Sequence, residues 1–530
     1  MSQPRVQIYD TTLRDGTQRA GLSLSLEDKL KVAQRLDRLG VAFIEGGWPG
    51  SNPKDAEFFA RARDMKWETA IVAAFGATRR VGVRVEDDDN LKALLAAKTA
   101  LCTVVGKTWA LHVTEVLRTT LDDNLAIIEE SVRYLRSQGR RVAYDAEHFF
   151  DGYHADPAYA LATLEAAARG GAEALVLCDT NGGSLPWDIE RWVREVTTKL
   201  GPQSPTVGIH CHNDTDSAVA NSLAAVRAGA RHVQGTINGY GERCGNANLC
   251  AIVPNLELKM GFGCLPQGAL TRVTEVAHFV AEVANQVPDE YMAYVGRNAF
   301  AHKGGIHVAA MRRDGRSYQH VEPSLVGNEM RVIVSELSGR GNLLSKAEEL
   351  GKDVAQLLQG GDVGEVLKEI KDNEAKGFSY EAADASVALL VLRRSPQYKP
   401  LFHLIDFMVT VEHRDQRGIF AEATVKVRLN GEVVHTAAEG DGPVNALDTA
   451  LRKALVPVYP DVARLKLQDY KVRILDGEHA TAAVTRVLID TSDGERTWGT
   501  VGASFNIIEA SWLALTDAIE YGLRLRQRAP

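Results

Sequence analysis

Two histidines lie two residues apart in the segment GIHCHNDTD, residues 208–216. In a β-strand, positions i and i+2 face the same side, so His210 and His212 can reach one point in space. Neutral imidazole is a common metal ligand, although a single histidine at a strand end is more often an ordinary hydrogen-bonded residue. The pair therefore suggests a metal site and leaves its reaction open.

An aspartate near the N-terminus can complete such a site. The segment DTTLRDGTQ, residues 10–18, contains Arg14 and Asp15. If the chain closes into a barrel, Asp15 comes close to His210 and His212 and forms a two-histidine, one-carboxylate site with open positions. That ligand set is also typical of non-haem iron oxygenases. The neighbouring arginine instead favours a substrate with a carboxylate next to a carbonyl, such as a 2-oxo acid.

Two further segments bear on this site. Thr180, at the end of the run ALVLCDTNGG, is placed to hold a substrate carboxylate. The glycine-rich stretch GYGERCGNANL, residues 239–249, reads most simply as a turn. An oxygen ligand from Asn246 is the alternative.

The first 240 or so residues alternate short apolar runs with helical stretches. The runs begin near residues 6, 41, 69, 100, 141, 174, 206 and 232, which is the spacing of βα units. This rhythm predicts an α/β fold with a (β/α)8 barrel over residues 1–265. A doubly wound open sheet is the alternative, but no G-x-G-x-x-G follows the first run. Polar residues gather at the predicted strand ends, where barrels hold their active sites. Besides those above, they are Glu45, Glu147, Asp179 and Asn238.

The remainder of the chain has a different pattern. Residues 266–395 are predicted to form helical linker subdomains, and residues 396–530 an α+β regulatory domain with two βββα repeats. LNGE and SDGE are typical hairpin turns. We expect the repeats to pack their sheets back to back. Gly440, Gly442 and Gly502 are expected to leave room for a small ligand near helix N-termini.

Composition limits the class of protein. The net charge is −8 with no basic tract, which argues against nucleic acid or an anionic membrane as a partner. No signal peptide is visible, and the apolar runs are too short to span a membrane. Six cysteines are present without a C-x-x-C pair, which favours reduced thiols and a cytoplasmic protein.

Several segments resemble a known enzyme family. DTTLRDGTQ, HCHND, GERCGNANL and AHKGGIH are similar to motifs of the metal-dependent 2-isopropylmalate synthase and homocitrate synthase family, which includes hydroxymethylglutaryl-CoA lyase as a relative. These synthases condense acetyl-CoA with a 2-oxo acid. The βββα repeats resemble their allosteric domain. IEGGWPGSNPKD and VQGTINGYGERCGNANLC most resemble the branch that forms (R)-citramalate from pyruvate. The isopropylmalate branch usually has Phe-Pro in place of Trp48-Pro49.

The resemblance implies a role for each matching residue. Asp15, His210 and His212 match ligands of a divalent cation, Mg²⁺, Mn²⁺ or Zn²⁺. Asn246 matches an additional ligand or a near neighbour, which strengthens the alternative above. Arg14 matches the cation that polarises the keto oxygen.

The remaining matches concern the two substrates. Glu147 matches a carboxylate that assists acetyl-CoA, and Thr180 a contact to the substrate carboxylate. His307, in GGIH, matches the base for acetyl-CoA, with Tyr318 near it. His302 is the rival base. The implied partners are pyruvate and acetyl-CoA as substrates, a second copy of the chain, and isoleucine as an effector.

Three other functions stay open. A sister synthase would use a different 2-oxo acid. A lyase would run related chemistry in reverse, but lyases of this family consist essentially of the barrel, whereas about 260 residues follow the barrel here. A non-catalytic metabolite-binding protein would not be expected to keep the Arg-Asp, His-x-His and Gly-Ile-His sets together.

Overall fold

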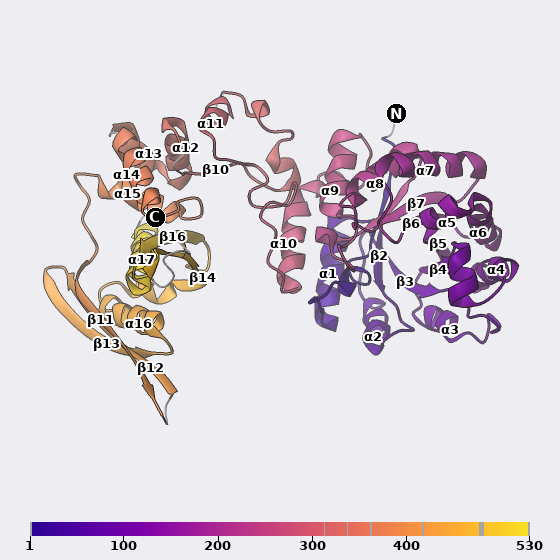
Figure 1. Cartoon of the computed structure of the whole chain (residues 1–530), viewed down its shortest axis with the longest axis horizontal. Helices are drawn as coiled ribbons and strands as arrows, with labels where there is room; N and C mark the ends of the chain where they lie inside the picture. The colour runs from indigo at the N-terminus through magenta and orange to yellow at the C-terminus, as the bar shows by residue number, and fades with distance from the viewer. Residues whose placement is uncertain are drawn as a thin grey trace. The chain divides into compact units, whose positions relative to one another are not determined.

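The computed structural model describes residues 3–311, 313–335, 338–360, 363–415, 418–475 and 482–527. The chain divides into two compact units (Figure 1). The first contains Met1–Phe300 and Val321–Glu329, and the second contains Ala301–His320 and Met330–Pro530. The domain limits at residues 265 and 395 stay predictions.

The first unit contains a closed barrel of eight parallel strands in the order β1 to β8. The strands are β1 Gln7–Asp10, β2 Phe43–Gly47, β3 Ile71–Ala77, β4 Leu101–Lys107, β5 Arg141–Glu147, β6 Ala174–Asp179, β7 Thr206–Cys211 and β8 His232–Gly235. β1 pairs with both β2 and β8, and this closes the barrel. The predicted (β/α)8 barrel is confirmed, and the open sheet is excluded.

Helices cover the outside of the barrel. They are α1 Leu26–Leu39, α2 Pro53–Ala62, α3 Asp89–Ala96, α4 Leu121–Ser137, α5 Phe149–Ala155, α6 Pro157–Gly170, α7 Pro186–Leu200, α8 Ala218–Ala228, α9 Leu249–Pro254 and α10 Val273–Val283. α1 shows why they begin and end where they do. Ser25 and Asp28 form a capping box at its start, and Gly40, with φ of 92°, ends it in the left-handed conformation that favours glycine.

A packed layer fills the amino-terminal half of the barrel interior. Tyr9, Phe43 and Leu101 are buried there in one apolar cluster. The ring of His232 lies 5.1 Å from that of Tyr9 between centroids, and burial lowers the pKa of this histidine to about 3. Because this layer is solid, side chains that bind ligands must lie at the carboxyl ends of the strands.

The second unit combines helices with two antiparallel sheets. Its elements are β9 Ala301–His302, α11 Gly305–Met311, β10 Arg331–Val332, α12 Arg340–Leu350, α13 Lys352–Gly360, α14 Val363–Ala375, α15 Asp384–Arg393, β11 His403–Arg414, β12 Gly418–Leu429, β13 Glu432–Gly440, α16 Pro443–Leu455, β14 Lys466–Ile474, β15 Thr485–Ser492, β16 Thr497–Ser504 and α17 Ile507–Gln527. The sheets have the orders β11-β12-β13 and β14-β15-β16. This confirms the two βββα repeats.

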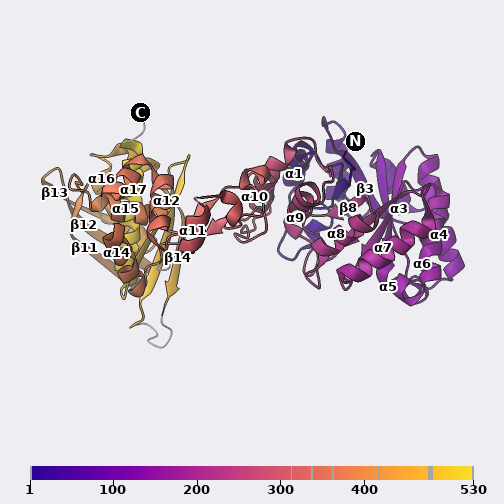
Figure 2. The same ribbon diagram turned by 90° about the horizontal axis from the view of Figure 1, so that it is seen from above.

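The repeats pack differently from the prediction. α16 covers the first sheet, α17 covers the second, and the two helices contact each other between the sheets (Figure 2). The back-to-back packing of the sheets is therefore wrong. The physical reason is that Val425 and Val487, on the inner faces, are buried against these helices in one shared core.

The glycines near the helix starts serve this packing. A Cβ added to Gly502 would lie 2.0 Å from the carbonyl oxygen of Ala510, and one added to Gly440 would lie 2.5 Å from the nitrogen of Ala446. The helix backbones fill the space at both positions, so the expected room for a ligand there is wrong. Gly442 is open, with nothing within 4 Å of an added Cβ.

The turn predictions hold. Asn430 and Gly431, with φ of 49° and 92°, join β12 to β13 as the two-residue LNGE turn requires. Gly494, with φ of 94°, lies in the SDGE turn between β15 and β16.

Across the described ranges, no helix combines the length and the apolar character needed to cross a membrane.

Candidate metal centre and active site

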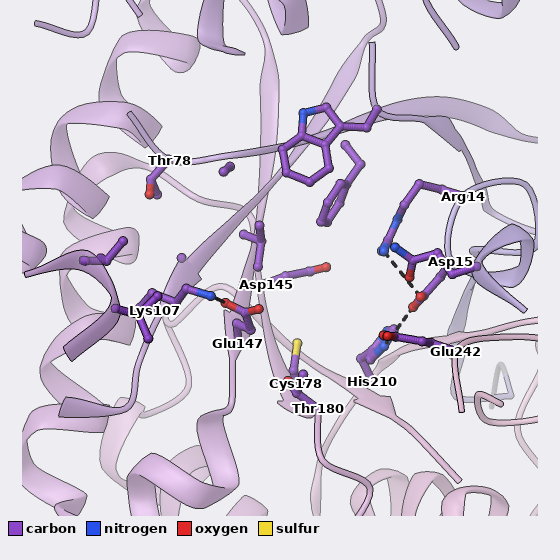
Figure 3. A pocket seen from close by; sticks show the side chains of 18 of the residues that line it. Arg14, Asp15, Thr78, Lys107, Asp145, Glu147, Cys178, Thr180, His210 and Glu242 are labelled. Carbon is purple, nitrogen blue, oxygen red and sulfur yellow. Dashed lines mark hydrogen bonds and ion pairs between the residues drawn. The ribbon is translucent and has the colours of Figure 1, made fainter. Parts of the chain in front are cut away.

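Asp15, His210 and His212 meet at the carboxyl end of the barrel. All three are buried, and one potential ligand atom from each lies within 4.8 Å of the others. Asp15 Oδ2 lies 3.3 Å from His210 Nε2 and 3.9 Å from His212 Nε2 (Figure 3 labels the first pair). The i, i+2 spacing along β7 brings the histidines together, and barrel closure brings the aspartate.

The glycine-rich loop brings Asn246 to the same place. Its backbone pairs with His212 in an isolated β-bridge. Asn246 Nδ2 donates a 2.7 Å hydrogen bond to Asp15 Oδ2, while Asn246 Oδ1 is buried with no hydrogen-bond partner among the described residues. Gly241 leaves room for this side chain, because an added Cβ would lie 1.9 Å from that oxygen and would displace it. Asn246 is thus a neighbour of the three residues, and its role as a ligand stays a prediction.

The side chains present fit a divalent cation. One carboxylate and two imidazoles suit hard-to-borderline divalent ions. In the described protein, His212 Nδ1 also lacks a hydrogen-bond partner. Burial and the neighbouring His210 lower the pKa of His212 to about 4, so its ring is neutral near pH 7. Burial opposes ionisation of Asp15, but the Arg14 charge and the contact with His210 hold its pKa well below the usual range.

Arg14 is fixed beside this group. Its Nε donates a 2.6 Å hydrogen bond to Glu45 Oε1, and its Nη1 lies 3.5 Å from Asp15 Oδ1. The guanidinium carbon lies 3.8 Å from the ring centroid of Phe75. Tyr9 donates a 2.7 Å hydrogen bond to the other oxygen of Glu45, which is fully buried. The cation is therefore held on two sides by other side chains.

A cavity of about 590 Å³ opens over these residues. Its lining also includes Glu147 and Thr180, so the structure brings both predicted residues to the same opening (Figure 3). Glu147 forms an ion pair with Lys107. Thr180 Oγ1 accepts a 2.9 Å hydrogen bond from the backbone N–H of His148.

Sequence reasoning missed several residues of this site. Lys107 ends β4, one residue beyond the apolar run by which that strand is recognised, and it is directly opposite Glu147 in the strand register. Asp145 lies two residues before Glu147, so strand alternation points it into the barrel. Burial and the charge of Glu45 raise its pKa to about 7. Gln234 occupies the matching inward position on β8 and has an exposed fraction of 0%.

His307 and Tyr318 belong to the second unit. Their rings stack with centroids 4.2 Å apart, and both side chains are exposed. The ring of His302 lies 6.5 Å from that of Tyr318, and burial lowers the pKa of His302. The ring of Tyr318 thus lies closer to His307 than to the rival base, His302.

Three family models match this chain. The HMGL-like model matches residues 5–280, and the model of the homocitrate synthase post-HMGL domain matches residues 294–377. The model of the LeuA allosteric (dimerisation) domain matches residues 381–523. Together they span the barrel, the linker helices and both βββα repeats.

Over nearly its full length, the chain is similar to (R)-citramalate synthases and to a 2-isopropylmalate synthase. It is 53% identical to the (R)-citramalate synthase of Synechocystis sp., over 98% of this chain and 96% of that protein. It is 49% identical to the (R)-citramalate synthase of Aquifex aeolicus, over 98% of each. A 2-isopropylmalate synthase of Solidesulfovibrio magneticus is 32% identical over 97% of this chain and 96% of that protein. The chain belongs to the (R)-citramalate synthase family.

Proposed function

We propose that this enzyme condenses acetyl-CoA with pyruvate and hydrolyses the thioester, giving (R)-citramalate and CoA for isoleucine biosynthesis. The observation that carries the proposal is the buried Asp15, His210 and His212 group beside Arg14, in a chain about half identical to (R)-citramalate synthases throughout. The metal is proposed to be Mg²⁺, Mn²⁺ or Zn²⁺, and the location cytoplasmic.

The keto acid is proposed to bind at Arg14. With Nε committed to Glu45, the guanidinium offers its terminal N–H groups to the keto oxygen. A divalent cation held by Asp15, His210 and His212, with Asn246 as a further ligand, would act as a Lewis acid on that oxygen. Thr180, which lines the cavity, is proposed to donate its hydroxyl to the substrate carboxylate.

The carbon–carbon bond requires an enolate of acetyl-CoA. His307, stacked on Tyr318, is proposed to take a proton from the acetyl methyl group, and Glu147 to assist. The resulting carbanion attacks the keto carbon of pyruvate, and the keto oxygen becomes an alkoxide beside Arg14. Water then attacks the thioester carbonyl, and the CoA thiolate leaves. The ion pair with Lys107 holds the Glu147 carboxylate in position for this sequence.

The cavity wall favours a small keto acid. Trp48 and Phe75 line the cavity, with ring centroids 5.3 Å apart, and Phe75 lies directly against Arg14. Trp48 Nε1 donates a 2.8 Å hydrogen bond to Asn90 Oδ1, which fixes the indole. A rigid aromatic wall next to the keto-binding cation would exclude a branched side chain. A 2-isopropylmalate or homocitrate synthase is therefore the less favoured alternative, and a hydroxymethylglutaryl-CoA-lyase-like activity less favoured still.

The second unit is proposed to form a homodimer and to bind isoleucine between the copies. Its outer sheet faces expose large apolar side chains, with Met408 exposed to 61% and Val433 to 57%. Both lie on the face of the first sheet opposite α16, as their register with β12 shows. The match to an allosteric (dimerisation) domain supports the same assignment. An effector bound there acts by favouring one state of the enzyme over another.

Metal dependence can be tested directly. We expect dialysis against EDTA to abolish CoA release and added Mn²⁺ to restore it. His210→Ala and His212→Ala should weaken Mn²⁺ binding, measured by electron paramagnetic resonance, by more than the roughly 10–100-fold that a lost outer-sphere partner costs. His154→Ala, at an exposed histidine of the same unit, is the control and should bind normally. Full activity in EDTA with no metal detected would contradict the proposal.

Substrate choice tests the aromatic wall. CoA release should show a higher kcat/KM for pyruvate than for 2-oxoisovalerate. Trp48→Ala should raise the ratio for 2-oxoisovalerate over pyruvate by roughly 10-fold, within the range that pocket size controls. Trp187→Ala, at a tryptophan exposed to 65%, should leave the ratio unchanged. A wild-type preference for 2-oxoisovalerate would instead assign the isopropylmalate reaction.

The base is tested by comparing two histidines. His307→Ala should lower kcat by about 10²–10⁴-fold, because proton transfer contributes that much, while the KM for pyruvate changes little. His302→Ala is the matched variant from the same segment and should lower kcat far less. A large loss in His302→Ala with near-normal turnover in His307→Ala would transfer the role to His302.

Dimerisation and inhibition are tested together. Wild type should sediment at twice the chain mass of 57.7 kDa and lose activity with isoleucine, without competition by pyruvate. Met408→Glu/Val433→Glu places two charges on the proposed interface and should yield the monomer and remove inhibition. Val287→Glu, at a valine of the first unit exposed to 94%, is the control. A double variant that stays dimeric would refute this interface.

A further inference from the structure

Gln234 is one of the fully buried polar residues that the mechanism above does not use. Gln234 lies on β8 opposite His210 in the strand register. Its Oε1 lies 2.9 Å from His210 Nδ1, and its Nε2 lies 3.0 Å from Asp145 Oδ1. Asp145 comes from β5, which is not adjacent to β8, so this second contact crosses the barrel interior. The three side chains have exposed fractions of 0%, 5% and 3% for the glutamine, histidine and aspartate.

The contacts define a direction for the hydrogen bonds. Above its pKa of about 7 the Asp145 carboxylate is ionised and only accepts, so it requires the amide NH₂ of Gln234 on its side. Among the described residues, Gln234 is the only side chain that donates to Asp145. The amide oxygen must then face His210, and it can only accept. His210 therefore carries its hydrogen on Nδ1.

This tautomer determines what His210 offers to a cation. With the hydrogen on Nδ1, Nε2 presents a lone pair, and Nε2 is the atom that faces Asp15 at 3.3 Å. With the hydrogen on Nε2, the same ring would instead donate to Asp15 and could not ligate. His212 has no such partner, because its Nδ1 is unpaired in the described protein. The barrel interior thus constrains one of the two imidazoles and not the other.

We propose that Gln234, itself oriented by Asp145, is a positioning residue that fixes the tautomer of His210 so that Nε2 can bind a divalent cation. The inference rests on the metal site of the proposed function and extends it to two residues that touch neither cation nor substrate. Outer-sphere partners of ligating histidines commonly act in this way. The rival role for Gln234 is only to fill a polar position in the barrel core.

The test measures Mn²⁺ affinity without substrates. The dissociation constant is obtained from the signal of unbound Mn²⁺ in electron paramagnetic resonance at pH 8, where Asp145, with a pKa of about 7, is mainly ionised. Gln234→Leu removes the acceptor and should weaken binding by about 10–100-fold. Gln138→Leu, the same change at an exposed glutamine of the same unit, should bind as wild type.

A second variant separates positioning from packing. In Gln234→Glu/Asp145→Asn the new glutamate accepts from His210 and the new asparagine donates to that glutamate, so the acceptor facing His210 Nδ1 is kept, while donor and acceptor exchange places in the hydrogen bond between positions 234 and 145. Its Mn²⁺ affinity should fall within about threefold of wild type. Circular dichroism confirms the fold of each variant. If Gln234→Leu does not fold, Gln234→Met, which also lacks an acceptor of comparable strength, takes its place with the same expected loss.

Each outcome decides between the two proposals. Weak binding in Gln234→Leu together with rescue in the double variant supports positioning. Normal Mn²⁺ affinity in Gln234→Leu, or equally weak binding in both variants, overturns the inference while wild-type binding leaves the metal site standing. Wild type that binds no Mn²⁺ overturns the metal site of the proposed function and this inference with it.

Discussion

The pairing of β1 with β8 is the contact on which the site depends. Without it, Asp15 and the β7 histidines would lie toward opposite edges of an open sheet, because six strands lie between β1 and β8 in the strand order. With it, residues more than 190 positions apart in sequence form one buried group. The packed amino-terminal layer around Tyr9 keeps the barrel from collapsing inward at that end. Closure therefore creates the site and also leaves the carboxyl end open to ligands.

Placing so many charges inside the barrel requires them to balance. The Arg14 cation balances the negative charges of Glu45 and Asp15, and it forms an ion pair with each of them. Removing one member of such a buried pair typically costs about 3–5 kcal/mol, because the other charge stays buried without compensation. Within the described ranges no cation is in contact with Asp145, so burial raises its pKa, while the Arg14 charge lowers that of Asp15. Two carboxyl groups in one barrel thus differ through their neighbours alone.

The sequence predicts the barrel well because its signals are local and repeated. Each βα unit carries its own apolar run and its own helix, and the His210 and His212 spacing follows from strand geometry alone. Contacts across the barrel are a different matter. Nothing in the residues around Gln234 indicates that it meets Asp145, since the two are 89 positions apart. The packing of the repeats could not be predicted from the sequence either. Either face of a three-stranded sheet can be buried, and the position of the helix decides which one is.

The second unit does not divide where its repeats begin. α15 precedes the first repeat, yet Val387, Leu389 and Val391 are buried in the same core as Trp512 of α17. Arg393 extends this attachment with 2.7 Å ion pairs to Asp517 and Glu520. Removing the residues after α15 would expose Val387, Leu389 and Val391. Each lost apolar contact of this kind costs about 1.5–3 kcal/mol. An engineer seeking a deregulated enzyme should therefore alter surface side chains and leave the polypeptide whole.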